Sequence, residues 1–134
     1  MKRKILFDTG FFHVHFDGLS EETKAVLKEV YEGKSLGYTL DLNLAEFVYV
    51  YGKLKGLEAA KAKLSVILNS PIRVVSTDRD LAMRAGELRL KHRDLSLVDC
   101  FVIALAEREG AVIYTTDSGI GKAYKNAVLL SLGD

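Results

Sequence analysis

Residues 95–117 read LSLVDCFVIALAEREGAVIYTTD, and this stretch decides the fold. Ser96 is a residue type that caps helix N-termini and Gly110 is typical of a helix end, so a helix is predicted between them. Nearly every side of this helix is apolar until Glu107, which indicates that the helix is buried. The next residues, 111–114, are continuously apolar, as expected for a central parallel strand covered on both faces.

A carboxylate stands on each side of this strand. Asp99 shares its helix face with apolar residues of the next turn, so its carboxylate is expected to point into the packed interior, where a charge needs a partner. Asp117 lies just past the carboxyl end of the predicted strand. Each acid also has a structural interpretation, because Ser96 and Asp99 have the spacing of a capping box and Asp117 suits the start of a turn. These residues alone leave both interpretations open.

The rest of the chain alternates between strand and helix signals. Apolar segments predict strands at residues 4–7, 36–39, 72–75, 111–114 and 127–130. Helices are predicted from a cap at Ser20 to Glu32, from a cap at Asp41 through 42–55, at 57–68, and from a cap at Thr77 with Asp80 to His92. Residues 11–16 predict a short helix or loop, and residues 118–124 a turn or short helix. This order predicts one α/β domain over residues 1–134, a doubly wound parallel sheet of five strands flanked by helices.

Two more acids fall at comparable places. Asp8 follows the first predicted strand and precedes Thr9 and Gly10, so it resembles Asp117 in position. Glu46 lies inside a predicted helix on a largely apolar face, unless it occupies an edge that reaches solvent. Ligands of open parallel sheets bind beyond the carboxyl ends of the strands, where the strand order reverses. All four acids are therefore expected at one edge of the sheet.

Gathered carboxylates imply a particular chemistry. Two carboxylates about 4 Å apart repel by roughly 4 kcal/mol near a protein surface, so a group of four raises its own pKa values or binds cations. Oxygen ligands without His or Cys suit Mg²⁺ or Mn²⁺. One or two such ions can activate water for in-line attack on a phosphodiester. The predicted reaction is phosphodiester hydrolysis.

The charge balance limits the kind of polyanion binding. The chain has 19 basic and 18 acidic residues, a net charge of +1, which argues against a generally cationic nucleic-acid coat. The predicted helix before His92 is rich in basic residues, and these favour a solvated face over an RNA groove: Arg84, Arg89, Lys91 and Arg93. The single Cys100 forms no internal disulfide and suits a reducing cytoplasm. Without a signal peptide or a membrane-length apolar run, a soluble cytoplasmic protein is expected.

Together these motifs resemble a PIN domain, particularly the compact VapC-type toxin ribonucleases. The resemblance rests on FDTG at residues 7–10, the helix of Glu46, LSLVDCFVIALA around Asp99 and IYTTDSG around Asp117, in this order over the whole length. It implies a Mg²⁺- or Mn²⁺-dependent endoribonuclease. The acids that would hold the metal are Asp8, Glu46, Asp99 and Asp117, with supporting hydroxyl groups at Thr9 and Thr116. It also implies a homodimer and an antitoxin partner that blocks the cleft.

Several alternatives stay open. Many PIN domains carry a further acid shortly after the position of Asp117, whereas residues 118–121 read SGIG here. The number of bound ions, one or two, is therefore left open. Dehalogenase-like phosphatases need a second Asp at the place of Gly10, and the residues that receiver domains require are missing. An RNA-processing nuclease without an antitoxin and a catalytically silent PIN-domain scaffold are the other readings.

The helix predicted at 42–55 suggests how two copies associate. Four large side chains on it cannot all face one core: Phe47, Tyr49, Tyr51 and Leu54. A homodimer through the outer surface of this helix is therefore expected.

Overall fold

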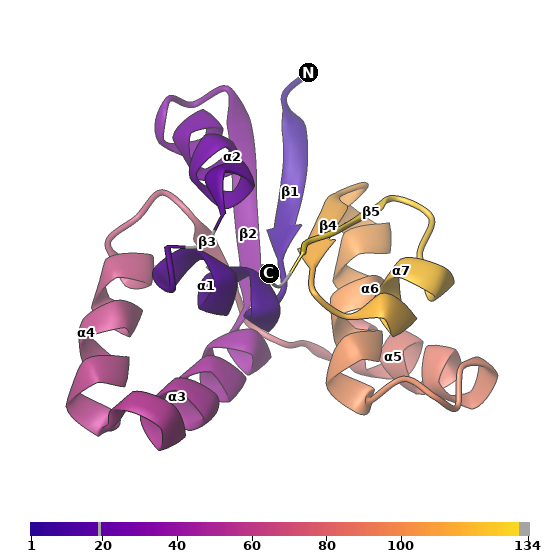
Figure 1. The fold of residues 1–134 in the computed structure, drawn as a ribbon. Helices are drawn as coiled ribbons and strands as arrows, with labels where there is room; N and C mark the ends of the chain where they lie inside the picture. The colour runs from indigo at the N-terminus through magenta and orange to yellow at the C-terminus, as the bar shows by residue number, and fades with distance from the viewer. Residues whose placement is uncertain (19, 132–134) are drawn as a thin grey trace.

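Five parallel strands form the sheet in this computed structural model, which describes residues 1–18 and 20–131 (Figure 1). The strands are β1 (Arg3–Phe7), β2 (Ser35–Leu40), β3 (Arg73–Val75), β4 (Val112–Thr115) and β5 (Ala127–Leu129). Seven helices lie in the described residues: α1 (Thr9–Phe16), α2 (Glu21–Tyr31), α3 (Asp41–Lys55), α4 (Leu57–Leu68), α5 (Arg79–Lys91), α6 (Leu97–Glu109) and α7 (Ser118–Ala123). The predicted α/β class is confirmed.

The strand order places a reversal at the middle of the sheet. The order is β3-β2-β1-β4-β5, so the chain first builds outward from β1 and then returns to β1's other side with β4. Phe7 pairs with Tyr114 at this junction, and the backbone N–H of Asp8 donates to the carbonyl of Tyr114 at 3.0 Å. The edge just beyond β1 and β4 is therefore the expected ligand site of an open parallel sheet.

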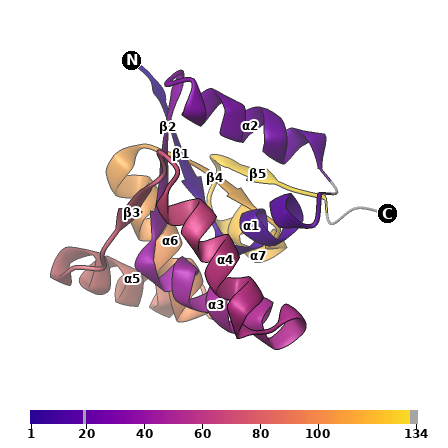
Figure 2. The same cartoon turned by 90° about the vertical axis from the view of Figure 1, so that its left-hand side faces the viewer.

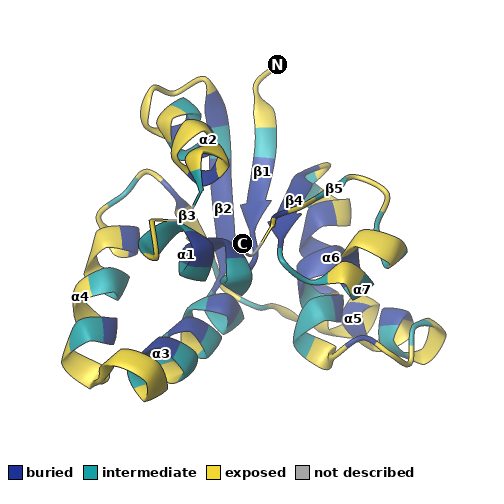
Figure 3. Ribbon diagram, viewed as in Figure 1, coloured by how far each residue is buried: buried dark blue, intermediate teal, exposed yellow. Residues whose placement is uncertain are grey.

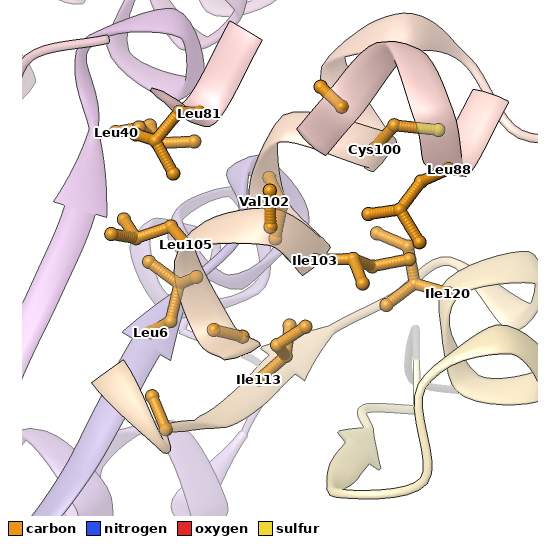
Figure 4. Packing of buried hydrophobic residues seen from close by; sticks show 14 of the residues in the cluster. Leu6, Leu40, Leu81, Leu88, Cys100, Val102, Ile103, Leu105, Ile113 and Ile120 are labelled. Atoms are coloured by element: carbon orange, nitrogen blue, oxygen red, sulfur yellow. The ribbon is translucent and has the colours of Figure 1, made fainter. Parts of the chain in front are cut away.

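Helices cover both faces of the sheet, so each face has its own apolar core (Figures 2 and 3). In β1, Leu6 packs on the face of α5 and α6, whereas Ile5 and Phe7 pack on the face of α1 to α4. Figure 4 shows Leu6 and Ile113 against α6 residues such as Leu105. Burial on both faces explains why the strands are continuously apolar.

The helix that the opening stretch predicts is α6. Ser96 is its N-cap, and Gly110 ends it in the left-handed conformation at φ 67°, where an L side chain would be strained. Most of its length is buried, including the free Cys100, as predicted. Because α6 runs antiparallel to β4, its first turn lies at the edge where the strands end (Figure 1).

Two predicted helix caps are wrong. The N-cap of α3 is Leu40 and not Asp41, because the Asn43 side chain accepts the backbone N–H of Leu40 at 3.3 Å. Asp41 instead opens the helix and accepts the backbone N–H of Thr77 at 3.2 Å. The N-cap of α5 is Asp78, whose carboxylate accepts from Leu81 at 2.9 Å, and not Thr77. At α5 two adjacent capping-type residues, Thr77 and Asp78, compete for the cap position, whereas at α3 the contacts of Asn43 and Asp41 place the helix start one residue earlier.

Other local predictions hold. The predicted cap at Ser20 is confirmed, since its hydroxyl accepts the backbone N–H of Thr23 at 3.1 Å. Residues 9–16 and 118–123 are helical rather than loops. No helix among the described residues has the length and apolar character needed to cross a membrane.

Candidate active site

One surface pocket collects all four acids that the sequence singled out. Asp8 lies between β1 and α1, Glu46 lies in α3, Asp99 in the first turn of α6, and Asp117 between β4 and α7. These helices converge below the carboxyl ends of β1 and β4 (Figure 1). The remaining lining residues are Thr9, Gly10, His13, Val50 and Thr116. No lysine or arginine lines the pocket in the part of the chain that the structure describes.

Asp8 is the most buried of the four acids, with 6% of its surface exposed. Its Oδ1 accepts the Asn43 side-chain amide at 3.0 Å, and its Oδ2 accepts the Thr115 hydroxyl at 2.6 Å. Burial raises the pKa of Asp8 to about 6, the hydrogen bond from Thr115 opposes the rise, and the charges of Asp99 and Glu46 add to it. Asp8 is therefore a carboxylate whose negative charge the fold does not fully compensate.

Asp99 caps its helix and also lines the pocket. It completes the capping box of α6, because its Oδ2 accepts the backbone N–H of Ser96 at 3.1 Å and its own N–H donates to the Ser96 hydroxyl at 3.1 Å. The same carboxylate lines the pocket. Burial is the main cause that raises the pKa of Asp99, and the charges of Asp117 and Glu46 raise it further. The cap therefore holds Asp99 in the pocket beside the other acids.

Asp117 and Glu46 are also held by local contacts. Asp117 starts α7, since its Oδ1 accepts the backbone N–H groups of Gly119 at 2.7 Å and Ile120 at 3.2 Å. The prediction that Asp117 starts a turn is therefore confirmed, and Asp117 also lines the pocket. Glu46 is half-buried and accepts the Thr9 hydroxyl at 2.7 Å. Thr9, one of the two supporting hydroxyl groups that the resemblance implied, therefore contacts one of the four acids.

Two polar residues that the sequence interpretation missed organise the pocket from inside. Asn43 is fully buried and its amide donates to both Asp8 Oδ1 and Thr9 Oγ1 at 3.0 Å. Thr115 is fully buried, and its hydroxyl donates to Asp8 and accepts the backbone N–H of Asp117 at 2.9 Å. Asn43 lies one helical turn before Glu46, and that spacing is the signal in the sequence that points to it.

The adjacent Thr116 occupies a different position from Thr115. It lines the pocket, and its side chain lies so close to Gly10 that a Cβ there would collide with it. The hydroxyl that contacts Asp8 and the backbone of Asp117 belongs to Thr115 instead. Gly10 therefore lets α1 begin close to the loop that carries Thr116 and Asp117.

His13 gives the pocket no positive charge. Its Nε2 is buried without a hydrogen-bond partner in the described residues, and its ring packs against Phe47 at 5.1 Å between centroids. Burial is the main cause that lowers the pKa of His13, although the charges of Asp17 and Glu46 oppose it. His13 therefore lines the pocket beside the acids as a neutral aromatic side chain.

The donor chemistry of the pocket fits a divalent cation. The donors are carboxylate and hydroxyl oxygens, the ligands that Mg²⁺ and Mn²⁺ prefer. Burial is the main cause that raises the pKa values of Asp8 and Asp99, and the charges of neighbouring acids add to the rise, so a bound cation would stabilise both carboxylates. In the described chain no three His, Cys, Asp or Glu side chains stand close enough to hold an ion as they are placed. One or two of these carboxylates, completed by water or substrate phosphate oxygens, are enough to hold Mg²⁺.

The profile of the PIN domain family matches residues 5–126, which include all four acids. The chain belongs to the PIN domain family. No curated protein sequence matches it. The family assignment and the parallel sheet agree with the resemblance drawn from the four motifs.

Solved structures with the same fold include several toxins. The sarcin-ricin loop cleaving toxin VapC20 of Mycobacterium tuberculosis is 22% identical, with a TM-score of 0.71, covering 90% of this PIN domain chain and 95% of that chain. VapBC2 from Rickettsia felis, bound to promoter DNA, is 18% identical with a TM-score of 0.76 and covers 95% and 97%. A toxin-antitoxin complex from Klebsiella pneumoniae is 21% identical with a TM-score of 0.68 and covers 92% and 95%. At these identities the similarity shows the fold.

Proposed function

We propose that this PIN domain is a Mg²⁺- or Mn²⁺-dependent endoribonuclease that acts in the cytoplasm. The observation that carries the proposal is the convergence of four carboxylates, without a lysine or arginine among the described lining residues, at the reversal point of the sheet. Structural carboxylates are normally paired with cations or exposed to water. A set of one buried and three half-buried carboxylates, lined by no lysine or arginine in the described residues, is instead a marker of a functional site.

The residues of the pocket have two roles. Some would bind the ion, and others hold the ion-binding side chains in place. Asp8, Asp99, Asp117 and Glu46 would hold the ion or ions. Bound divalent ions supply a polarised water and stabilise the leaving oxygen of a phosphodiester. Asn43 and Thr115 fix the orientation of Asp8, while Thr9 fixes Glu46. The capping boxes and turns keep the carboxylates in place before substrate binds.

The toxin role and the antitoxin partner are part of the same proposal. Several structures with this fold are named as VapC toxins or toxin-antitoxin complexes, and their chains are nearly the same length as this one. The described pocket is open and superficial, so a bound protein segment can cover it. We therefore propose that an antitoxin inhibits this nuclease by covering the acids.

The cut ends of RNA test the mechanism. Incubation of the protein with total RNA and Mn²⁺ is expected to give 5′-phosphate and 3′-hydroxyl ends, because attack by water leaves the 2′-hydroxyl unused. Sequencing of ligated ends measures this, and an Asp94→Asn variant, altered at an exposed acid outside the pocket, is the active control. Cyclic phosphate ends, or full cleavage in chelator, would contradict the mechanism. Absence of cleavage with Mg²⁺ and Mn²⁺ would favour a silent scaffold.

The homodimer also stays a proposal. The apolar surface of α3 that is available for the contact is smaller than the sequence suggested. Phe47 and Tyr51 are buried in the core, whereas Tyr49 and Leu54 are 66% and 68% exposed. Light scattering at micromolar concentration is expected to give a dimer, and a Tyr49→Glu/Leu54→Glu variant is expected to be monomeric because it places charges in an apolar contact. Tyr31→Glu, on exposed α2, should leave the dimer unchanged. A monomeric wild type would contradict the proposal.

A further inference from the structure

A second hollow lies at the C-terminal end of α5, beside the first turn of α6. It is lined by Gly86, Arg89, Leu90, Arg93 and Leu97. Leu90 and Leu97 are 82% and 53% exposed, so the floor is apolar and open to solvent. Arginines supply its polar rim, and no acid lines it within the described chain.

The arginines of this region fall into two groups. Arg84 donates to Glu107 at 2.8 and 3.0 Å, and Arg108 donates to Asp78 at 2.8 Å, so both are used to join α5 to α6. For Arg89 and Arg93, by contrast, the described residues provide no hydrogen-bond or ion-pair partner. Two of the basic residues that were expected on a solvated face, Arg89 and Arg93, therefore lie together at the rim of this hollow.

The hollow lies close to the pocket of the four acids. Leu97 lines the hollow and Asp99 lines the pocket, and both belong to the first turn of α6. Residues two apart on a helix face nearly opposite sides, so the hollow and the pocket flank this turn. The separation across a helix is about 10 Å. A strand of RNA that crosses the first turn of α6 reaches both sites.

Charge gives a reason for such an arrangement. Four carboxylates repel the phosphates of an approaching RNA, and the pocket itself has no lysine or arginine among its described lining residues. The net charge of +1 supplies no general attraction. Arginine binds phosphates through two N–H groups and stacks its guanidinium plane on nucleobases, whereas the leucines offer an apolar surface to a base.

We propose that the hollow between α5 and α6 binds the sugar-phosphate backbone of the RNA substrate next to the scissile bond, with Arg89 and Arg93 as the phosphate contacts. This inference rests on the proposed ribonuclease function and adds the residues that position its substrate. If two copies of the chain met through this hollow, the arginines of both copies would lie close together. Because like charges repel, a dimer through this surface is disfavoured.

Binding in chelator separates the inference from the cleavage reaction. The anisotropy of a short fluorescein-labelled oligoribonucleotide is titrated with wild type and with an Arg89→Ala/Arg93→Ala variant at several salt concentrations. The variant is expected to bind about tenfold more weakly, and the slope of log K against log salt should fall by about 1.4, at about 0.7 per phosphate contact. In Mn²⁺ the variant should raise KM for RNA and leave kcat near the wild-type value.

A matched control is available on the same helix. Arg79 is exposed, does not line the hollow, and lies about 15 Å from Arg89 along α5, which exceeds the Debye length at physiological salt. Arg79→Ala removes the same charge and should leave the affinity and the salt slope unchanged. Melting temperatures of all variants should match the wild type, because no partner of Arg89 or Arg93 is lost.

Three outcomes would overturn the inference. RNA affinity and KM that are unchanged in the double variant would exclude the phosphate contacts. An equal loss in Arg79→Ala would reduce the effect to overall charge. A changed oligomeric state with unchanged RNA binding would assign the surface to a second copy. If wild type binds RNA through these arginines and does not cut it with Mg²⁺ or Mn²⁺, the ribonuclease function fails while the binding site stands.

Discussion

An Asp8→Asn variant is expected to be more stable than the wild type near pH 8 in chelator and to lose RNA cleavage. Burial raises the pKa of Asp8 from 3.8 to about 6, so the folded state binds this proton more tightly than the unfolded state. Above about pH 6 the folded protein therefore carries an unfavourable charge, and this cost disappears as the pH falls through 3.8. At 1.36 kcal/mol per pKa unit the cost is about 3 kcal/mol.

The size and pH dependence of the gain are the measured quantities. Chemical unfolding near pH 8 should show up to about 3 kcal/mol more stability for Asp8→Asn, and near pH 4 less than about 1 kcal/mol. The asparagine oxygen can still accept the Asn43 amide, but the asparagine NH2 group replaces the oxygen that accepts the Thr115 hydroxyl, so the lost Thr115 hydrogen bond offsets part of the gain from removing the charge. Asp94→Asn, at an exposed acid, should change stability by less than about 0.5 kcal/mol at either pH.

Divalent cations should make the wild type more stable than the Asp8→Asn variant. Mn²⁺ that binds only the folded wild type raises its melting temperature by mass action, and the variant should gain much less. Cleavage by the variant should fall by about a hundredfold or more, since loss of a supporting residue alone costs up to that much. A variant that melts lower in chelator near pH 8 would show that hydrogen bonds to Asp8 outweigh the cost of its charge.

The fold could be predicted from the sequence because it depends on patterns that local chemistry sets. Continuous apolar segments such as residues 111–114 identified the strands, and their alternation with helices implied a parallel sheet. The positions of Asp8 and Asp117 after two strands were enough to expect them at one edge, and the structure places both in one pocket. Strand order itself was not specified, and the adjacency of β1 and β4 comes from the structure.

What the sequence could not supply was the choice between neighbouring residues of similar type. Thr115 and Thr116 look alike in sequence, but the strand pleat turns Thr115 inward to Asp8 and leaves Thr116 at the pocket wall. Likewise, Arg84 and Arg89 share a helix, and the packing of α5 on α6 pairs only Arg84 with Glu107. Such choices depend on tertiary contacts, which no periodicity encodes.

A Thr115→Val variant is expected to be strongly destabilised although the side chain keeps its shape. The hydroxyl donates to Asp8 at 2.6 Å and accepts the backbone N–H of Asp117 at 2.9 Å, and valine can do neither. A hydrogen bond to a charged group contributes about 1.5–3 kcal/mol, and an unpaired buried N–H costs about 1–3 kcal/mol. A loss of roughly 2–4 kcal/mol in the free energy of unfolding near pH 8 is therefore expected.

Two comparison variants isolate the hydroxyl group from the packing of the side chain. Thr115→Ser keeps the hydroxyl and should cost about 0.5–1.5 kcal/mol for the missing methyl group, with most of the cleavage activity retained. In Asp8→Asn the charge is already absent, so the valine substitution should cost about 1–2 kcal/mol less there than in wild type. Valine should also raise the pKa of Asp8 further, because the hydrogen bond from Thr115 lowers it. Equal costs of Thr115→Val in both backgrounds would show that the hydroxyl serves the Asp117 backbone and does not hold the Asp8 carboxylate.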